Sequence, residues 1–169
     1  MLDAYLEVLD DAYFEVKEAF DGLADENVWK RPADGLLSIG EIAGHVGYWQ
    51  AVKFASDTKD AEMDVSQCHV KSLLIDPRFR YYPGVLAASP SPEQLAMTAA
   101  EVGSELQRIH TEAIAYFRTR NLDLDGSLPG YPANFTVRAI VRYAAIHVAY
   151  HVGQIYTVRH LLGETTPDN

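Results

Sequence analysis

Apolar residues recur at alternating intervals of four and three in four long segments, and this spacing restricts the fold more than any other feature. In the first segment the apolar positions are Leu2, Leu6, Leu9, Tyr13, Val16, Phe20 and Leu23. The spacing places one apolar stripe along a helix that should stop near Gly22. Because every stripe needs a partner to bury it, four such segments predict an all-α four-helix bundle.

The second segment begins at a capping-box pattern, Ser38-Ile39-Gly40-Glu41. In such a box the serine oxygen accepts from an early backbone N–H, and the glutamate accepts from the N–H of the capping residue. The helix is expected to extend to about Ser56, with an apolar face made of Ile39, Ile42, Val46 and Trp49.

Two further helices are predicted in the second half of the chain. One starts at Ser91-Pro92-Glu93, where proline suits the first helical position, and ends near Asn121. The other is capped at about Thr136 and runs to Leu162. This last helix carries two adjacent apolar stripes, so we expect it to have neighbours on several sides.

Residues 57–89 have no helical period and form a long insert between the second and third helices. The insert holds two prolines and the aromatic residues Phe79, Tyr81 and Tyr82. Ordered loops of this length are uncommon in compact domains and often cover a functional site. Two interpretations stay open: a partly helical insert packed on the outside, and a lid or dimer contact.

The length of 169 residues predicts a single domain over residues 1–169. A net charge of −10 without a basic cluster disfavours binding to nucleic acid or to anionic lipid. The single cysteine, Cys68, excludes an internal disulfide framework and is compatible with a reducing compartment. The acidic first residues do not resemble a signal peptide, and no apolar run approaches about 18 residues, so we expect a cytoplasmic protein.

Three polar residues interrupt the apolar surface of the fourth helix: His147, His151 and Gln154. Residues four apart differ by about 40° in direction and about 6 Å in height, so the two imidazoles could bind one ion. His45, on or beside the apolar face of the second helix, could complete a three-histidine site. Histidines satisfied by hydrogen bonds within the core would explain the pattern as well. The glutamate of an H-E-x-x-H zinc protease is absent.

The other histidines lie elsewhere in the pattern. His110, at the edge of its stripe, could be a fourth ligand, although a position on the surface or flank is more usual. His160 is expected to be solvated near the end of its helix. His69 follows Cys68 in the insert, and such a pair could be reactive.

Several polar side chains have two interpretations each. Glu41 could be only the capping acid, or it could orient the His45 imidazole one turn away. Gln154 could orient His151 or a bound water, or be satisfied within the core. The tyrosines are candidate proton donors that packing explains equally well: Tyr48, Tyr150 and those of the insert.

The segment Ile39-Gly-Glu-Ile-Ala-Gly-His45-Val-Gly-Tyr-Trp49, followed about a hundred residues later by His147-Val-Ala-Tyr-His151-Val-Gly-Gln154-Ile155, resembles the DinB-like superfamily, which includes YfiT-type metal-dependent hydrolases. The resemblance extends to the connection from Trp29 to Pro32. It implies a four-helix bundle with a three-histidine metal site, whose ligands would be His45, His147 and His151. The chain departs from its relatives at Val152, where arginine is frequent, and in the insert.

Three neutral histidines would leave a divalent ion with open positions, as in catalytic sites. Such an ion can turn bound water or a thiol into a nucleophile. Imidazole suits zinc, nickel, copper and iron, and we expect zinc or nickel. The resemblance implies a metal-dependent hydrolase or a transferase that uses low-molecular-weight thiols such as bacillithiol or mycothiol. We therefore expect a small-molecule substrate, and a homodimer is compatible with the family. The alternative is a non-catalytic, metal-binding, stress-associated protein.

Overall fold

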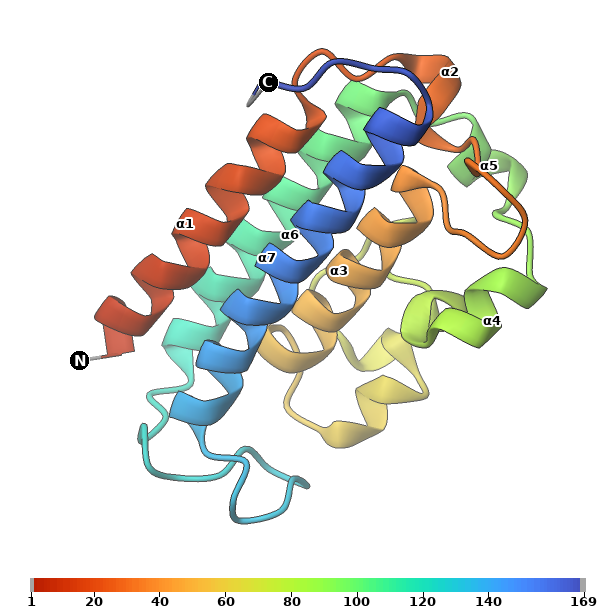
Figure 1. The fold of residues 1–169 in the computed structure, drawn as a ribbon. Helices are drawn as coiled ribbons and strands as arrows, with labels where there is room; N and C mark the ends of the chain where they lie inside the picture. Colours follow the sequence, from red (N-terminus) through yellow and green to blue (C-terminus); the bar gives the residue numbers. More distant parts are fainter. Residues whose placement is uncertain (1, 168–169) are drawn as a thin grey trace.

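The computed structural model describes residues 2–167, apart from the side chains at positions 83, 85 and 86. Four long helices form a bundle: α1 (Leu2–Phe20), α3 (Ile39–Phe54), α6 (Ala99–Thr119) and α7 (Val137–Leu161). In Figure 1, α1 and α7 run in one direction and α3 and α6 in the other. In chain order these directions are up, down, down and up. Within the bundle, α1 and α3 each pack against both α6 and α7. The predicted all-α bundle is confirmed.

Most helix ends follow the local sequence. Gly22, with φ of 65°, follows the last turn of α1 and adopts the left-handed conformation that glycine tolerates. The capping box of Ser38 and Glu41 is complete at the start of α3. Thr136 caps α7, and its side chain accepts from the backbone N–H of Ala139.

The third long helix begins later than predicted. Residues Pro92–Leu95 make only a short helix, α5, and α6 starts at Ala99. Thr98 and Glu101 form a complete capping box there, which satisfies the first N–H groups of a new helix. Leu95, at the end of α5, lies outside the long helix and is 50% exposed.

The insert is part of the connection between two parallel neighbours, α3 and α6. Parallel adjacent helices require a crossover that returns the chain along the bundle. The crossover contains η1 (Lys59–Glu62), η2 (Val65–Gln67), η3 (Pro77–Arg80) and α4 (Tyr82–Ala87) before α5. The bundle order therefore accounts for a long segment at this place in the chain.

The crossover packs more deeply than an insert lying on the outside. Leu74 and Phe79 are fully buried, and Cys68, Val70 and Ile75 are nearly so. The η3 segment contacts α3, which carries one of the three candidate ligands. The shorter connection between α1 and α3 contains the small helix α2 (Asp25–Val28).

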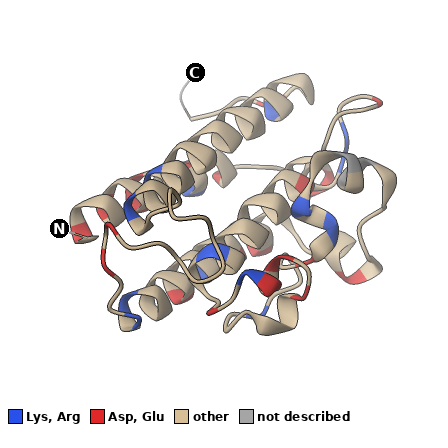
Figure 2. Cartoon of the chain, turned by 90° about the horizontal axis from the view of Figure 1, so that it is seen from below, with Lys and Arg blue, Asp and Glu red and all other residues tan. Residues whose placement is uncertain are grey.

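Figure 2 shows acidic and basic residues spread over the helices and connections. Among the described residues, no helix combines the length and apolar character needed to cross a membrane.

Candidate metal centre

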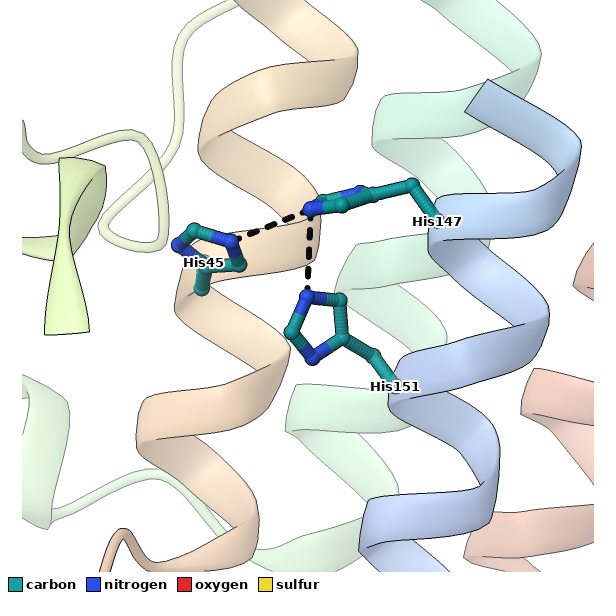
Figure 3. A group of neighbouring side chains, drawn as sticks. All are labelled: His45, His147 and His151. Carbon is teal, nitrogen blue, oxygen red and sulfur yellow. Dashed lines mark hydrogen bonds between the residues drawn. The ribbon is translucent and has the colours of Figure 1, made fainter. Parts of the chain in front are cut away.

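Three histidines from two antiparallel helices converge in the groove between α3 and α7 (Figure 3). His45 comes from α3, whereas His147 and His151 lie one turn apart on α7. All three side chains are half-buried. The structure therefore brings together the three histidines that the sequence pattern indicates as candidate ligands.

The ring nitrogens lie at distances that suit ligands of one ion. His147 Nε2 lies 3.1 Å from His45 Nε2 and 3.1 Å from His151 Nε2. One nitrogen from each ring can be chosen so that all three lie within 4.8 Å of one another. Two nitrogen ligands of a tetrahedral zinc ion, each at about 2.0–2.1 Å, would be about 3.3 Å apart.

Hydrogen bonds at the far side of two rings fix their tautomers. His45 Nδ1 lies 2.7 Å from the carbonyl oxygen of Phe79, and His151 Nδ1 lies 2.7 Å from Gln154 Oε1. Both oxygens accept, so each Nδ1 must carry a proton and donate it. In the neutral rings, the Nε2 atoms of His45 and His151 are left with lone pairs that face the centre of the cluster.

The three Nε2 atoms that face one another cannot all be satisfied by hydrogen bonds within the cluster. His147 Nε2 faces both neighbours, and a neutral ring can donate from that nitrogen to only one of them. At least one inward-facing Nε2 lone pair would then have no donor. A cation bound between the three rings removes this conflict, so the donor set fits a divalent metal ion of the kind that imidazole prefers.

Burial keeps the three imidazoles neutral. It lowers the pKa of His45, an effect that the hydrogen bond to Phe79 only partly opposes. Burial and the neighbouring imidazoles lower the pKa of His147 to about 3. The same causes, burial first and His45 second, lower the pKa of His151 to about 4. Neutral rings are the form that binds metal, so little free energy is needed to deprotonate them near neutral pH.

The Phe79 carbonyl was missed by sequence reasoning, because a backbone oxygen leaves no residue signature. One indirect signal is Gly44, which directly precedes His45. A Cβ at Gly44 would lie 2.5 Å from the Phe79 ring, so only glycine lets that ring approach α3 so closely. Gly44 thus allows the crossover to reach the first histidine.

Gln154 and Glu41 have separate roles. Gln154 Oε1 accepts from His151 Nδ1, as expected if Gln154 orients that ring. The Gln154 amide nitrogen donates to the Tyr150 hydroxyl at 3.1 Å. Glu41 accepts from the backbone N–H of Ser38 at 2.9 Å and pairs with Arg31. Its carboxylate is therefore engaged in capping α3 and in an ion pair.

The remaining histidines lie outside the cluster. His110 is neither a fourth ligand nor a surface residue, because it is only 6% exposed and contacts Gln50 and Asp10. The position of His110 at the edge of its stripe gives no sign of these partners, which lie on other helices. His160 is exposed near the end of α7, as predicted.

Cys68 and His69 do not form a reactive pair. Cys68 is buried, and burial raises the pKa of its thiol to about 11. His69 lies at the surface, 3.2 Å from Asp57 Oδ2. A thiol with so high a pKa carries little thiolate near neutral pH.

A cavity of about 700 Å³ adjoins the histidines. His45 and His147 form part of its wall, together with mostly apolar residues of α3 and α7. Its volume lies within the range of small-molecule sites. Among the described residues, no fourth histidine, cysteine or acidic residue joins the three histidines as a potential ligand.

A family model with the description DinB superfamily matches residues 9–155, a range that includes all three histidines. No curated protein matches the chain.

Proposed function

We propose that this chain, which belongs to the DinB superfamily, is a metal-dependent enzyme. The divalent metal ion would be held by His45, His147 and His151. The reaction belongs to one of two classes, hydrolysis or the transfer of a low-molecular-weight thiol. Zinc and nickel are the proposed metals because three imidazoles suit both.

One observation carries this proposal: the Nε2 atoms of His45 and His151 both face His147 Nε2 at 3.1 Å. Hydrogen bonds to Phe79 and Gln154 hold the two outer rings in the tautomer that binds metal. A set of core histidines without metal would more naturally pair each nitrogen with an oxygen or an N–H group.

His45, His147 and His151 would hold a divalent ion, which would supply a Lewis acid able to lower the pKa of water or of a thiol toward neutral pH. The chain's own residues orient the ligands and shape the space for a substrate. Phe79 and Gln154 hold the imidazoles of His45 and His151, and Tyr150 in turn hydrogen-bonds the Gln154 amide. Mostly apolar side chains beside His45 and His147 line the cavity in which a substrate would bind.

The second candidate is a metal-binding protein without turnover. A sealed structural site would be expected to have four protein ligands, whereas three ligands next to a cavity are typical of catalytic sites. The three-histidine group and the adjoining cavity therefore favour catalysis.

Element-resolved metal analysis of protein purified without an affinity tag tests the metal centre. We expect about one zinc or nickel ion per chain, and an absence of divalent metal after incubation with either ion would overturn the proposal. Metal-loaded and metal-free protein would then be assayed for ester or amide hydrolysis and for transfer of bacillithiol, mycothiol or glutathione to electrophiles. Activity in neither assay, with the metal bound, would favour the non-catalytic candidate.

A further inference from the structure

We infer that the cavity beside the three histidines binds an elongated, partly aromatic molecule with a carboxylate at the end away from the histidines. The inference rests on the proposed function, because it takes the histidine end of the cavity as the place of reaction. It goes further by naming the substrate class and the two residues, Lys53 and Arg80, that bind its charged end.

The shape of the cavity follows from the two antiparallel helices. Lys53 lies two turns after His45 on α3, and Ala139 lies two turns before His147 on α7. Both displacements point in the same direction along the groove and amount to about 12 Å. The cavity therefore has a histidine end and a Lys53 end.

Aromatic and aliphatic side chains form the wall between the two ends. They come from both helices and from the loop before α7: Trp49, Phe135, Ile140, Tyr143 and Val148. Trp49 is the clearest example, because its ring lies 6.5 Å from the His45 ring, centroid to centroid. Such walls favour a substrate with an apolar, partly aromatic body.

The charged residues of the wall are all basic. Lys53 and Arg80 line the cavity, and no aspartate or glutamate does so among the described residues. The chain as a whole has 24 acidic and only 14 basic residues, so the cavity has the opposite charge balance. This contrast favours an anionic ligand over a neutral or cationic one.

One carboxylate behind the wall neutralises only part of this charge. Glu62, which is 8% exposed, accepts from Lys53 Nζ at 2.9 Å and from Arg80 Nη2 at 2.9 Å. Two cations share a single carboxylate, so a net positive charge remains. The Lys53 ammonium also donates to the Tyr131 hydroxyl at 2.7 Å, which is uncharged when protonated. Burial, and Glu62 after it, raises the pKa of Tyr131, so this hydroxyl keeps its proton.

The Lys53 ammonium lies over the ring of Trp49, a residue one turn nearer to His45 on α3. Its Nζ lies 4.7 Å from the centroid of the Trp49 ring, which is itself 6.5 Å from the His45 ring, so the ammonium is within about 11 Å of that imidazole. An aromatic ring with a short alkyl chain spans such a distance. A carboxylate at one end can therefore reach Lys53 while the other end lies beside the histidines.

Three probes with the same carbon skeleton test the charge preference: 4-phenylbutanoate, 4-phenylbutanol and 4-phenylbutylamine. Their affinities would be measured by calorimetry on wild-type protein, both loaded with zinc and metal-free. We expect the carboxylate to bind about tenfold more tightly than the alcohol in both forms, and the amine to bind most weakly.

Two lysine variants locate the carboxylate. In Lys53→Met the carboxylate should lose its advantage over the alcohol, while the alcohol binds as before. Lys17→Met, which removes an exposed lysine of α1, should leave all three affinities unchanged. Circular dichroism checks that both variants are folded. If a variant fails to fold, the affinities of the three probes for wild-type protein still test the charge preference.

Two results would overturn the inference. One is equal affinity of the three probes for wild-type protein. The other is a carboxylate preference that needs zinc and survives Lys53→Met, because the carboxylate would then bind at the metal. If the protein bound no metal at all, the proposed function would fail, and the metal-free measurements would still decide the charge preference.

Discussion

His110 on α6 and the three-histidine cluster lie in the same bundle, but their ring nitrogens have different partners. His110 donates from Nε2 to Asp10 Oδ1 at 2.8 Å, and its Nδ1 accepts from the Gln50 amide at 3.1 Å. The ring also stacks on Tyr13, with centroids 3.8 Å apart. In the cluster, Nε2 of His147 meets two other ring nitrogens instead.

The difference separates a structural histidine from a candidate ligand. Every nitrogen of His110 has a complementary partner, so its burial needs no ion. The cluster has matched partners only at its outer edge, where Phe79 and Gln154 accept from Nδ1. Burial alone therefore does not identify a metal site, whereas unmatched lone pairs that converge on one point do.

The largest effect is expected from His147→Ala, because His147 is the central ring of the cluster. The variant should lose bound zinc or nickel while keeping most of its helix content, since only one half-buried side chain is removed. Metal analysis and circular dichroism measure the two properties. His69→Ala is the matched control for an exposed histidine and should retain the metal. Equal metal content in wild type and His147→Ala would contradict the ligand assignment.

The opposite outcome is expected for His110→Ala. The variant should keep its metal but lose about 2–3 kcal/mol of unfolding free energy, because Gln50 is left without its buried partner and a cavity forms beside Tyr13. Urea denaturation of the metal-free proteins measures the loss. A drop in metal content would show that the two histidine sites are coupled.

A pair of glutamine variants sharpens the comparison. Gln154→Leu should weaken zinc binding about tenfold without abolishing it, because His151 loses the hydrogen bond that fixes its tautomer. Competition with a chromophoric chelator measures the affinity. Gln50→Leu, which removes the corresponding partner of His110, should leave zinc affinity unchanged. If the two variants had equal effects on zinc, orientation by Gln154 would be refuted.

The smallest effect concerns pH. Burial lowers the pKa of His110 below its ordinary value of 6.5, while Asp10 opposes the shift and Arg118 adds to it. The unfolded imidazole therefore binds a proton at a higher pH than the folded one, and stability falls as pH decreases below 6.5. Between pH 6.5 and about 5.5 the wild type should lose at most about 1 kcal/mol more than His110→Ala. Urea titrations at the two pH values check this difference. Equal losses of unfolding free energy in wild type and His110→Ala would contradict the lowered pKa of His110.

Local signals in the sequence were sufficient for most of the bundle. The apolar stripes predicted the long helices, and the Ser38–Glu41 box predicted the start of α3. The start of α6 is also encoded locally, because Thr98 and Glu101 have capping-box spacing. Pro92 is typical of a helix start and predicts the long helix from this position, but it opens only the short helix α5.

Only those residues of the site whose positions follow from the face of their own helix could be predicted from the sequence. His147 and His151 follow from helical spacing, and His45 from its place on the apolar face of α3. The Phe79 carbonyl and the Lys53–Arg80 pair depend on how the crossover packs, which no local period encodes. His110 likewise has a hydrogen-bond partner, Asp10, that lies 100 residues earlier in the chain.

His45 and His147 are separated by 102 residues, and the whole crossover lies between them. An ion bound to both would act as a removable cross-link that ties the first half of the chain to the last helix. The free energy of metal binding would then contribute to folding, because the unfolded chain would have to bring distant ligands together. Withdrawing the metal would loosen the α3–α7 pairing, so the supply of metal would also regulate how long the folded protein persists.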